Sequence, residues 1–174
     1  MKISPLADCP QFAPLVAQWH FGEWGHLYPG GTVDGWLDHI RTRMHVDRIP
    51  MTVVALDDRS EPVGTAALTE HDMDTHPELS PWLGGVYVIL TARRRGVASA
   101  LIRHLMGSAA DFGVRNLYLY TNSAEDLYRK LEWRLLSQES YMGREVALMT
   151  SRPSSRSRSA SPPAAQRRFA RRPL

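Results

Sequence analysis

The sequence predicts a single α/β (α+β) domain in which a mixed, mostly antiparallel sheet is flanked by helices. Apolar runs of strand length alternate with helical patterns through the first 150 residues. Two of these runs, 50–56 and 63–69, flank the turn-forming segment 57–60, which indicates an antiparallel hairpin. The run 86–90 instead passes through a cationic, glycine-containing turn into a helix. A hairpin combined with a strand-to-helix connection gives a sheet of mixed direction.

The first third of the chain is expected to supply one strand and two helices. Residues 2–6 form a short strand closed by Pro5, and a helix is expected from about Gln11 to Trp19. The segment from Phe21 to Gly31 is rich in helix breakers and aromatic residues, so it is expected to be a loop that contacts another group. A second helix is expected from Val33 to about Val46.

After the hairpin, the acidic segment from Glu70 to Glu78 is expected to be a loop before the next strand. One face of a third helix is continuously apolar, and its members are Ala98, Leu101, Ile102, Leu105, Ala109 and Phe112. Gly113 suits the position just beyond that helix. A strand at 116–120 and a short helix follow, with Ser123 and Asp126 as its capping pair, and a strand pair at 134–137 and 145–149 ends the domain.

The turn between the strand 86–90 and the third helix is a candidate phosphate-binding site. Its residues are Arg93, Arg94, Arg95, Gly96, Val97, Ala98 and Ser99. The first backbone N–H groups of a helix have no partner within the helix, and the positive end of its dipole lies behind them. Arginine side chains add charge-assisted hydrogen bonds, and small residues allow the backbone to approach an anion. The pattern therefore predicts binding of a phosphate group.

This turn resembles the acetyl-CoA loop of the GCN5-related N-acetyltransferase (GNAT) family, which reads Arg/Gln-x-x-Gly-x-Gly/Ala and is matched by Arg93, Gly96 and Ala98. Further along, Ala124 followed by Leu127-Tyr128-Arg129-Lys130 is similar to the family's Ala-x-x-Leu-Tyr-x-Lys motif. Glu132 replaces a glycine that is common in the family. The resemblance covers residues 1–150 and implies the acyl-CoA acyltransferase fold and N-acetyltransferase activity with acetyl-CoA as cosubstrate and no metal.

The resemblance also implies roles for individual residues. The backbone of Val86, Tyr87 and Val88 would pair with the pantetheine arm and polarise the thioester carbonyl, and Asn122 would reach that arm from the other side. Tyr128 matches the tyrosine that stabilises the leaving thiolate. A tyrosine at an apolar helix position usually serves packing alone. The match to the Ala-x-x-Leu-Tyr-x-Lys motif is therefore what favours a catalytic role for Tyr128.

Deprotonation of the acceptor amine needs a base, because a lysine-like amine is neutral in only roughly one part in 2,500 at pH 7. Glu70 is the first candidate, and Asp72 and Glu23 are alternatives. The histidines His20, His26 and His71 are further candidates. We expect Trp24, Tyr28 and Asp72 to bind the acceptor, with Glu70 and Asp74 adding to an acidic, aromatic-lined rim that favours a cationic amine.

The basic charge of the chain is concentrated at its C-terminus. Seven of the 21 Lys and Arg residues and none of the 18 Asp and Glu residues follow position 150, which leaves 14 basic and 18 acidic residues before it, a net charge of −4. The segment 151–174 is rich in Arg, Ser and Pro and is expected to be disordered. Nucleic-acid binding through this tail is an alternative function, and a catalytically silent acyl-CoA sensor is another.

Other features bear on the location and partners of the protein. There is no run of 18 apolar residues, and residues 1–9 lack the apolar stretch of a signal peptide, so we expect a cytoplasmic protein without a membrane partner. Cys9 is the only cysteine, which excludes an internal disulfide and a cysteine metal cluster. The sequence leaves both the identity of the amine and the formation of a homodimer open.

Overall fold

A computed structural model describes residues 1–153 of the chain. The expected disordered tail lies outside the described residues from position 154 onward. The longer helices are α1 (Ala13–Trp24), α2 (Val33–Arg41), α3 (Val97–Asp111) and α4 (Glu125–Arg129). Short 3₁₀ helices are η1 (Leu6–Asp8), η2 (Pro10–Phe12), η3 (Gly25–Leu27) and η4 (Leu90–Ala92). Within residues 1–153, no helix is both long and apolar enough to cross a membrane.

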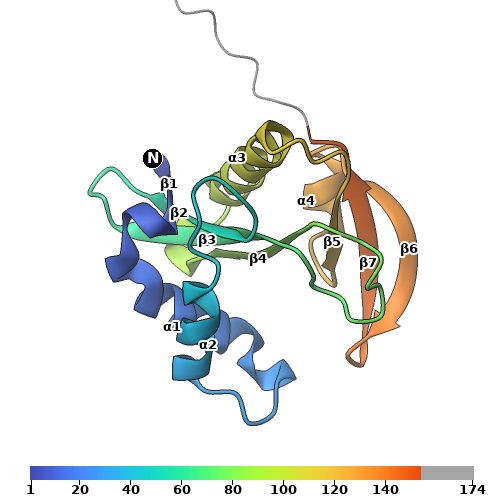
Figure 1. The fold of residues 1–174 in the computed structure, drawn as a ribbon, viewed down its shortest axis with the longest axis horizontal. Coiled ribbons are helices and arrows are strands. Elements are labelled where there is room, and N and C mark those ends of the chain that lie inside the picture. Colours follow the sequence, from blue (N-terminus) through green and yellow to red (C-terminus); the bar gives the residue numbers. More distant parts are fainter. Residues whose placement is uncertain (154–174) are drawn as a thin grey trace, which may run out of the picture.

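The strands form one seven-stranded sheet with the order β1-β2-β3-β4-β5-β7-β6 (Figure 1). They are β1 (Lys2–Pro5), β2 (Met51–Leu56), β3 (Pro62–Thr69), β4 (Trp82–Val88), β5 (Leu117–Thr121), β6 (Arg134–Tyr141) and β7 (Arg144–Ser151). Every neighbouring pair is antiparallel except β4 and β5, which are parallel. The mixed, mostly antiparallel sheet predicted from the sequence is confirmed.

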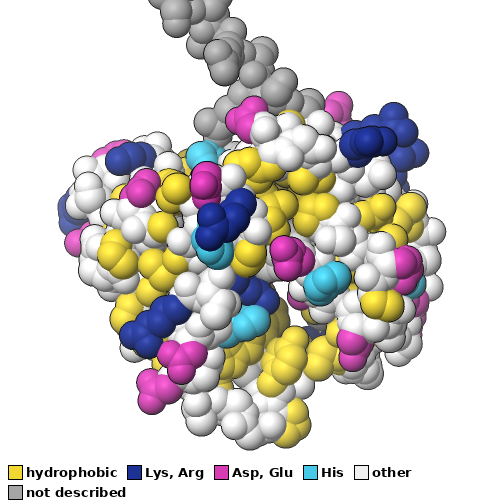
Figure 2. Space-filling model, viewed as in Figure 1, with side chains coloured by type: hydrophobic (Ala, Val, Ile, Leu, Met, Phe, Trp, Pro, Cys, Tyr) yellow, Lys and Arg dark blue, Asp and Glu magenta, His cyan; other side chains and the backbone are white. Residues whose placement is uncertain are grey.

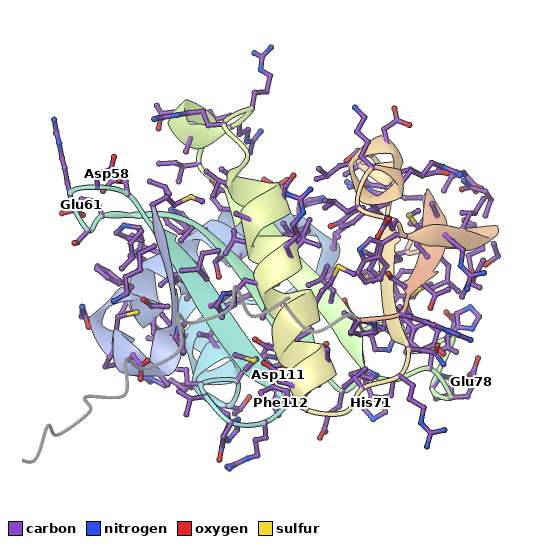
Figure 3. All side chains as sticks on the ribbon, turned by 90° about the horizontal axis from the view of Figure 1, so that it is seen from above. Asp58, Glu61, His71, Glu78, Asp111 and Phe112 are labelled. Atoms are coloured by element: carbon purple, nitrogen blue, oxygen red, sulfur yellow. The ribbon has the colours of Figure 1, made fainter. Side chains whose placement is uncertain are left out.

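Helices cover both faces of the sheet, as Figures 1 and 3 show. The apolar stripe of α3, including Leu101 and Leu105, packs on one face against Val53 of β2 and Leu68 of β3. On the other face, α1 and α2 cover a second core that includes Val54. Because β2 is covered on both sides, all six of its residues are buried, which explains its unbroken apolar sequence.

The sheet opens between β4 and β5. These strands share a single pair in register, Trp82 opposite Tyr118, and the Tyr118 N–H donates to the Pro81 carbonyl at 3.1 Å. Beyond this point β4 keeps its pairing with β3, but in the described part of the chain no strand pairs with it on the β5 side. Trp82 itself is fully buried and lies 5.9 Å from the ring of Tyr118, so a compact apolar contact marks the place where the strands diverge.

Several boundaries differ from the expectation. Helix α1 continues to Trp24, so the first part of the expected aromatic loop is helical, and α2 ends at Arg41 rather than near Val46. The Ser123 side chain does not cap α4. Instead, Thr121 Oγ1 accepts hydrogen bonds from the N–H groups of Ser123 and Ala124. The side chain that accepts these bonds therefore lies at the end of β5, before the turn that leads into α4.

Two positions that the sequence analysis singled out adopt the left-handed backbone conformation. Gly113 follows α3 with φ +78°, which confirms the predicted role of this glycine. Glu132, which occupies the place of a glycine in the resembling motif, has φ +65°. The turn between α4 and β6 therefore keeps a glycine-like shape with a different side chain.

Candidate active site

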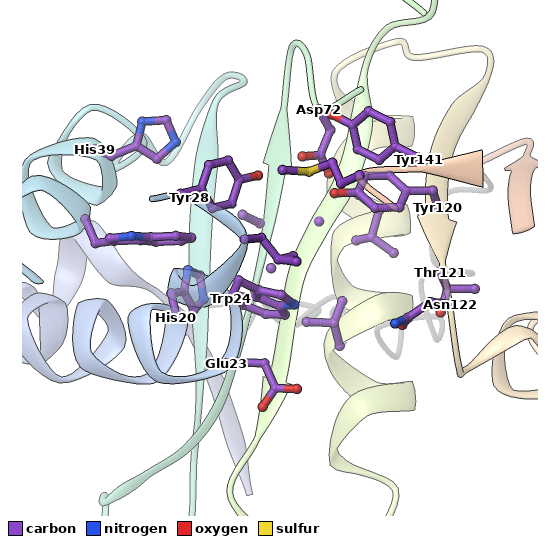
Figure 4. Close-up of a pocket in the computed structure, with 18 of the residues that line it drawn as sticks. His20, Glu23, Trp24, Tyr28, His39, Asp72, Tyr120, Thr121, Asn122 and Tyr141 are labelled. Atoms are coloured by element: carbon purple, nitrogen blue, oxygen red, sulfur yellow. The ribbon is translucent and has the colours of Figure 1, made fainter. Parts of the chain in front are cut away.

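A cavity of about 760 Å³ occupies the opening between β4 and β5. Figure 2 shows the hollow on the molecular surface, and Figure 4 shows the side chains that line it. One wall comes from α1, η3 and α2, and the other from the ends of β5 and β7 with α4. The floor is β4. The cavity size lies within the usual range for small-molecule sites, which is roughly 300–1,000 Å³.

Two glycines in β4 let other side chains approach this floor. A Cβ at Gly84 would lie 2.7 Å from Asp72 Oδ2, and a Cβ at Gly85 would lie 2.9 Å from His20 Cε1. Gly85 also has φ +59°, and the register between β3 and β4 shifts here by one residue, which is a β-bulge. The missing side chains and the bulge therefore admit an acid and an imidazole at the surface of β4.

Asp72 lines the cavity, and its carboxyl group has a raised pKa. Loss of water around it raises the pKa of Asp72 to about 6, and Arg43 offsets only part of this rise. Tyr28 and Tyr120 point toward Asp72 in Figure 4. Burial is the main cause of a raised pKa at both phenols, and the charge of Asp72 raises each further. Near neutral pH, Asp72 is thus an ionised carboxylate that takes up a proton more readily than an exposed one.

His20 is a buried imidazole in the same cavity. Burial and the charge of Arg43 lower the pKa of His20 to about 4, so the ring is neutral at pH 7. Its Nε2 makes no hydrogen bond of good geometry among the described residues, although the adjacent Gly85 backbone opposes part of the fall in pKa. The ring packs edge-to-face on Trp24 at 5.1 Å. An unpaired buried nitrogen is costly, so a bound molecule that supplied a partner would stabilise this arrangement.

The charged residues of the lining are of both signs. They are Glu23, Asp72, Arg43 and Arg144. Glu70 and Asp74 are outside the lining, so the acidic rim expected from the sequence is replaced by a mixed one. Arg144 donates to His26 Nε2 across 2.8 Å, which joins β7 to η3.

The opposite wall brings Asn122 and Tyr128 to the cavity. Tyr128 is 7% exposed and packs edge-to-face on Trp133 at 6.0 Å. Burial raises the pKa of Tyr128 to about 12, so its hydroxyl keeps its proton at any ordinary pH. The group can donate a hydrogen bond to the cavity but is a poor source of a free proton.

The N-terminus of α3 has the features of an anion site, although it lies outside the cavity lining. Helix α3 begins at Val97 after Gly96, which has φ +81°, and Arg94 before it has φ +59°. Among residues 1–153, no side chain caps the helix, and none of their atoms lies within 4 Å of a Cβ built on Gly96. Successive N–H groups in such a turn converge on a concave, open surface.

The arginines of this turn differ in their contacts. Arg93 Nε donates to the Val88 carbonyl at 2.9 Å, so this guanidinium helps to fix the turn. Arg94 and Arg95 are exposed. An anion at the end of α3 would thus meet two exposed guanidinium groups and a turn held in shape by the third.

The structure separates the predicted site residues into three groups. The cavity lining contains Trp24, Tyr28, Asp72, Val86, Asn122 and Tyr128, and it includes the alternative candidates Glu23, His20, His26 and His71. Tyr87 stacks on Trp19 at 5.4 Å and Val88 joins the core, so only their backbone groups could face a ligand. Glu70 is exposed and outside the lining.

Sequence reasoning missed several residues of the lining, including Trp36, Arg43 and Tyr120. Trp36 and Tyr120 fitted the apolar patterns of a helix and a strand, so they gave no separate signal. Arg43 was placed within a helix that in fact ends at Arg41. The only sign in the sequence that Arg43 could line a site was its position as a cationic residue shortly after an amphipathic helix.

Comparison with known proteins identifies the architecture. Residues 14–133 match the model of the acetyltransferase (GNAT) family. An aminoglycoside 6′-N-acetyltransferase complexed with coenzyme A superposes with a TM-score of 0.69 at 16% identity, covering 90% of this chain and 99% of that one. A spermidine N-acetyltransferase from Vibrio cholerae, in complex with CoA and spermine, gives 0.66 at 16%, covering 87% and 95%.

A GNAT-family acetyltransferase from Streptococcus pneumoniae gives a TM-score of 0.65 at 17% identity, covering 88% of this chain and 99% of that one. At these identities the likeness shows a shared fold. No curated protein sequence matches this chain.

The raised pKa of Asp72 predicts a pH-dependent stability. The folded state holds this proton up to about pH 6 and the unfolded state only up to about 4. The stabilisation is therefore complete below pH 4 and is lost as the pH rises to 6, by an amount on the order of 3 kcal/mol. We expect the free energy of unfolding of the wild type, relative to Asp72→Asn, to fall over this window in urea titrations. A constant difference would contradict the assignment.

Proposed function

Because this chain belongs to the acetyltransferase (GNAT) family, and is thus an acyltransferase that uses acetyl-CoA, we propose that it transfers the acetyl group directly to a primary amine in a ternary complex. The acceptor is a small cationic amine or an amine of a peptide or protein. The observation that carries this proposal is the opening between β4 and β5, with Asp72 on one side and Tyr128 on the other. A carboxylate that can accept a proton thus lies on one side of the unpaired edge of β4, and a phenol that can donate a hydrogen bond lies on the other.

Residues on both sides of this opening are suited to hold the donor. The N–H groups at the start of α3, with Arg94 and Arg95, would bind its diphosphate. The unpaired side of β4 and Asn122 would hold the pantetheine arm. The donor supplies an acetyl thioester, whose carbonyl becomes more negative as an amine attacks. A backbone N–H near Val86 would stabilise this charge, which is typically worth about 3 kcal/mol.

Asp72 is the group best suited to receive the proton of the acceptor. A lysine-like ammonium has a pKa of about 10.4, so transfer to a carboxylate of ordinary pKa near 3.9 costs about 9 kcal/mol. With the pKa of Asp72 at about 6, the same transfer costs only about 6 kcal/mol. The carboxylate also attracts the ammonium to the cavity. Glu70 was the first candidate from the sequence, but it is exposed and does not line this space.

Tyr128 is suited to the sulfur of the donor. A phenol with a pKa of about 12 would lose about 5 kcal/mol in giving its proton to a thiolate of pKa near 8.5. Tyr128 therefore stabilises the leaving thiolate by donating a hydrogen bond. The proton removed from the amine can neutralise the thiolate later, through solvent.

The first test is release of CoA from acetyl-CoA in the presence of a panel of primary amines. We expect Asp72→Asn to lower kcat/KM at least 100-fold and to remove an acidic limb of the pH profile near pH 6, because the variant has no group to accept the proton. Glu70→Gln is the matched control and should change kcat/KM less than threefold. A larger loss in Glu70→Gln than in Asp72→Asn would reverse this assignment of the base.

Removal of the Tyr128 hydroxyl should affect turnover rather than donor binding. We expect Tyr128→Phe to lower kcat at least tenfold with little change in the Kd for acetyl-CoA, because the lost hydrogen bond forms only as sulfur leaves. Tyr118→Phe, at a tyrosine outside the lining, should keep full turnover. An unchanged kcat in Tyr128→Phe would exclude Tyr128 from the mechanism.

The diphosphate site can be tested by calorimetry with CoA. Gly96→Glu should weaken binding at least tenfold, because it places a negative charge at the open turn. Gly113→Glu is a control for backbone strain, since Gly113 also has a positive φ and open space at its Cβ. It lies at the other end of α3, about 20 Å away for a helix of this length. Equal affinities in the two variants would place the diphosphate elsewhere.

A further inference from the structure

We propose that the acceptor is a small molecule carrying an anionic group, such as a carboxylate, a few bonds from its amine, and that Arg43 binds this anion. The inference rests on the proposed function, since it assigns the acceptor to the same cavity. It narrows the acceptor from primary amines in general to compact zwitterions.

The first support is the state of Arg43. Its side chain is half-buried and lines the cavity. In the part of the chain that the structure describes, no carboxylate lies within ion-pair distance of its guanidinium, and the side chain donates no hydrogen bond. Nearby Arg41 contrasts with it, since its exposed guanidinium pairs with Asp38 at 2.9 Å. A guanidinium that loses water without gaining a partner is costly, so Arg43 favours a ligand that brings a negative charge.

The acids of the cavity do not fill this role. Asp72 lies near enough for its charge to act on Arg43, but the two do not form an ion pair. Asp72 is also needed to attract the ammonium and to take its proton. Glu23 is the other acid of the lining. Figure 4 shows it near the bottom of the view, well apart from Asp72 near the top. Arg144, the other cation of the lining, is exposed and already donates to His26. Asp72 and Arg43 thus present one anion and one cation to a ligand, and a zwitterion satisfies both.

The neutral groups around these charges suit a compact ligand. Tyr28 packs on Trp36 at 5.7 Å, and the ring of His20 lies 6.1 Å from Trp36, which makes a rigid aromatic wall. The unpaired Nε2 of His20 adds a further hydrogen-bonding group. A polyamine would instead bring a second ammonium into a cavity that already holds Arg43. The repulsion between these like charges would weaken its binding.

The test compares three acceptors that differ in the charge at the far end: 4-aminobutyrate, 4-aminobutanamide and 1,4-diaminobutane, with homologues of three to six carbons. Wild-type kcat/KM should be at least tenfold higher for the best ω-amino acid than for the diamine of equal length. Arg43→Gln should lower this ratio at least tenfold, and Arg43→Glu should reverse the preference. Arg41→Gln is the matched control and should keep the wild-type ratio.

Each ratio is measured within one variant, so a loss of folded protein cancels. If amines are acetylated but the ratio is the same in wild type, Arg43→Gln and Arg43→Glu, the zwitterion inference is wrong and the proposed function stands. If acidic peptides are acetylated and none of the small amines is, the acceptor is a polypeptide and the inference is again wrong. Absence of CoA release with every acceptor, despite CoA binding, would overturn both proposals.

Discussion

The site depends on a sheet in which two adjacent parallel strands stop pairing. Strands β4 and β5 meet only where Trp82 lies opposite Tyr118 and then diverge, so the edge of β4 is open within the molecule rather than at its border. Backbone groups that lack a strand partner need another one. An extended molecule lying between the strands can supply it, and in the proposed function that molecule is the linear donor.

Glycines in β4 convert this opening into a site with unusual charges. Without side chains at 84 and 85, Asp72 and His20 reach the floor of the cavity, where little water surrounds them. The same lack of water favours the protonated form of Asp72 and the neutral form of His20, and it lowers the pKa of Arg43. Each charged group in the cavity thus loses hydration, which costs free energy unless a group of opposite charge lies beside it. Ligand charges of opposite sign can then contribute more than they would at the surface.

The sequence predicted the parts of the structure that depend on local pattern. The apolar stripe of α3, the glycine after it and the strand-to-helix turn at Gly96 follow from residue spacing and backbone preference. The choice between Glu70 and Asp72 was not local. It depends on a contact between Asp72 and Gly84, and no periodicity links these positions. Arg43 escaped notice for a similar reason, because its place in the lining follows from the folded chain and not from its neighbours in the sequence.

The hydrogen bond between Arg144 and His26 has a consequence for the chemistry of the cavity rim. An arginine in a protein donates and does not accept, so His26 Nε2 must be the acceptor and its ring hydrogen must lie on Nδ1. The contact between β7 and η3 therefore selects one tautomer of the imidazole. The two walls of the cavity are thus joined by a hydrogen bond that leaves Nδ1 as the nitrogen of His26 that can donate to another group.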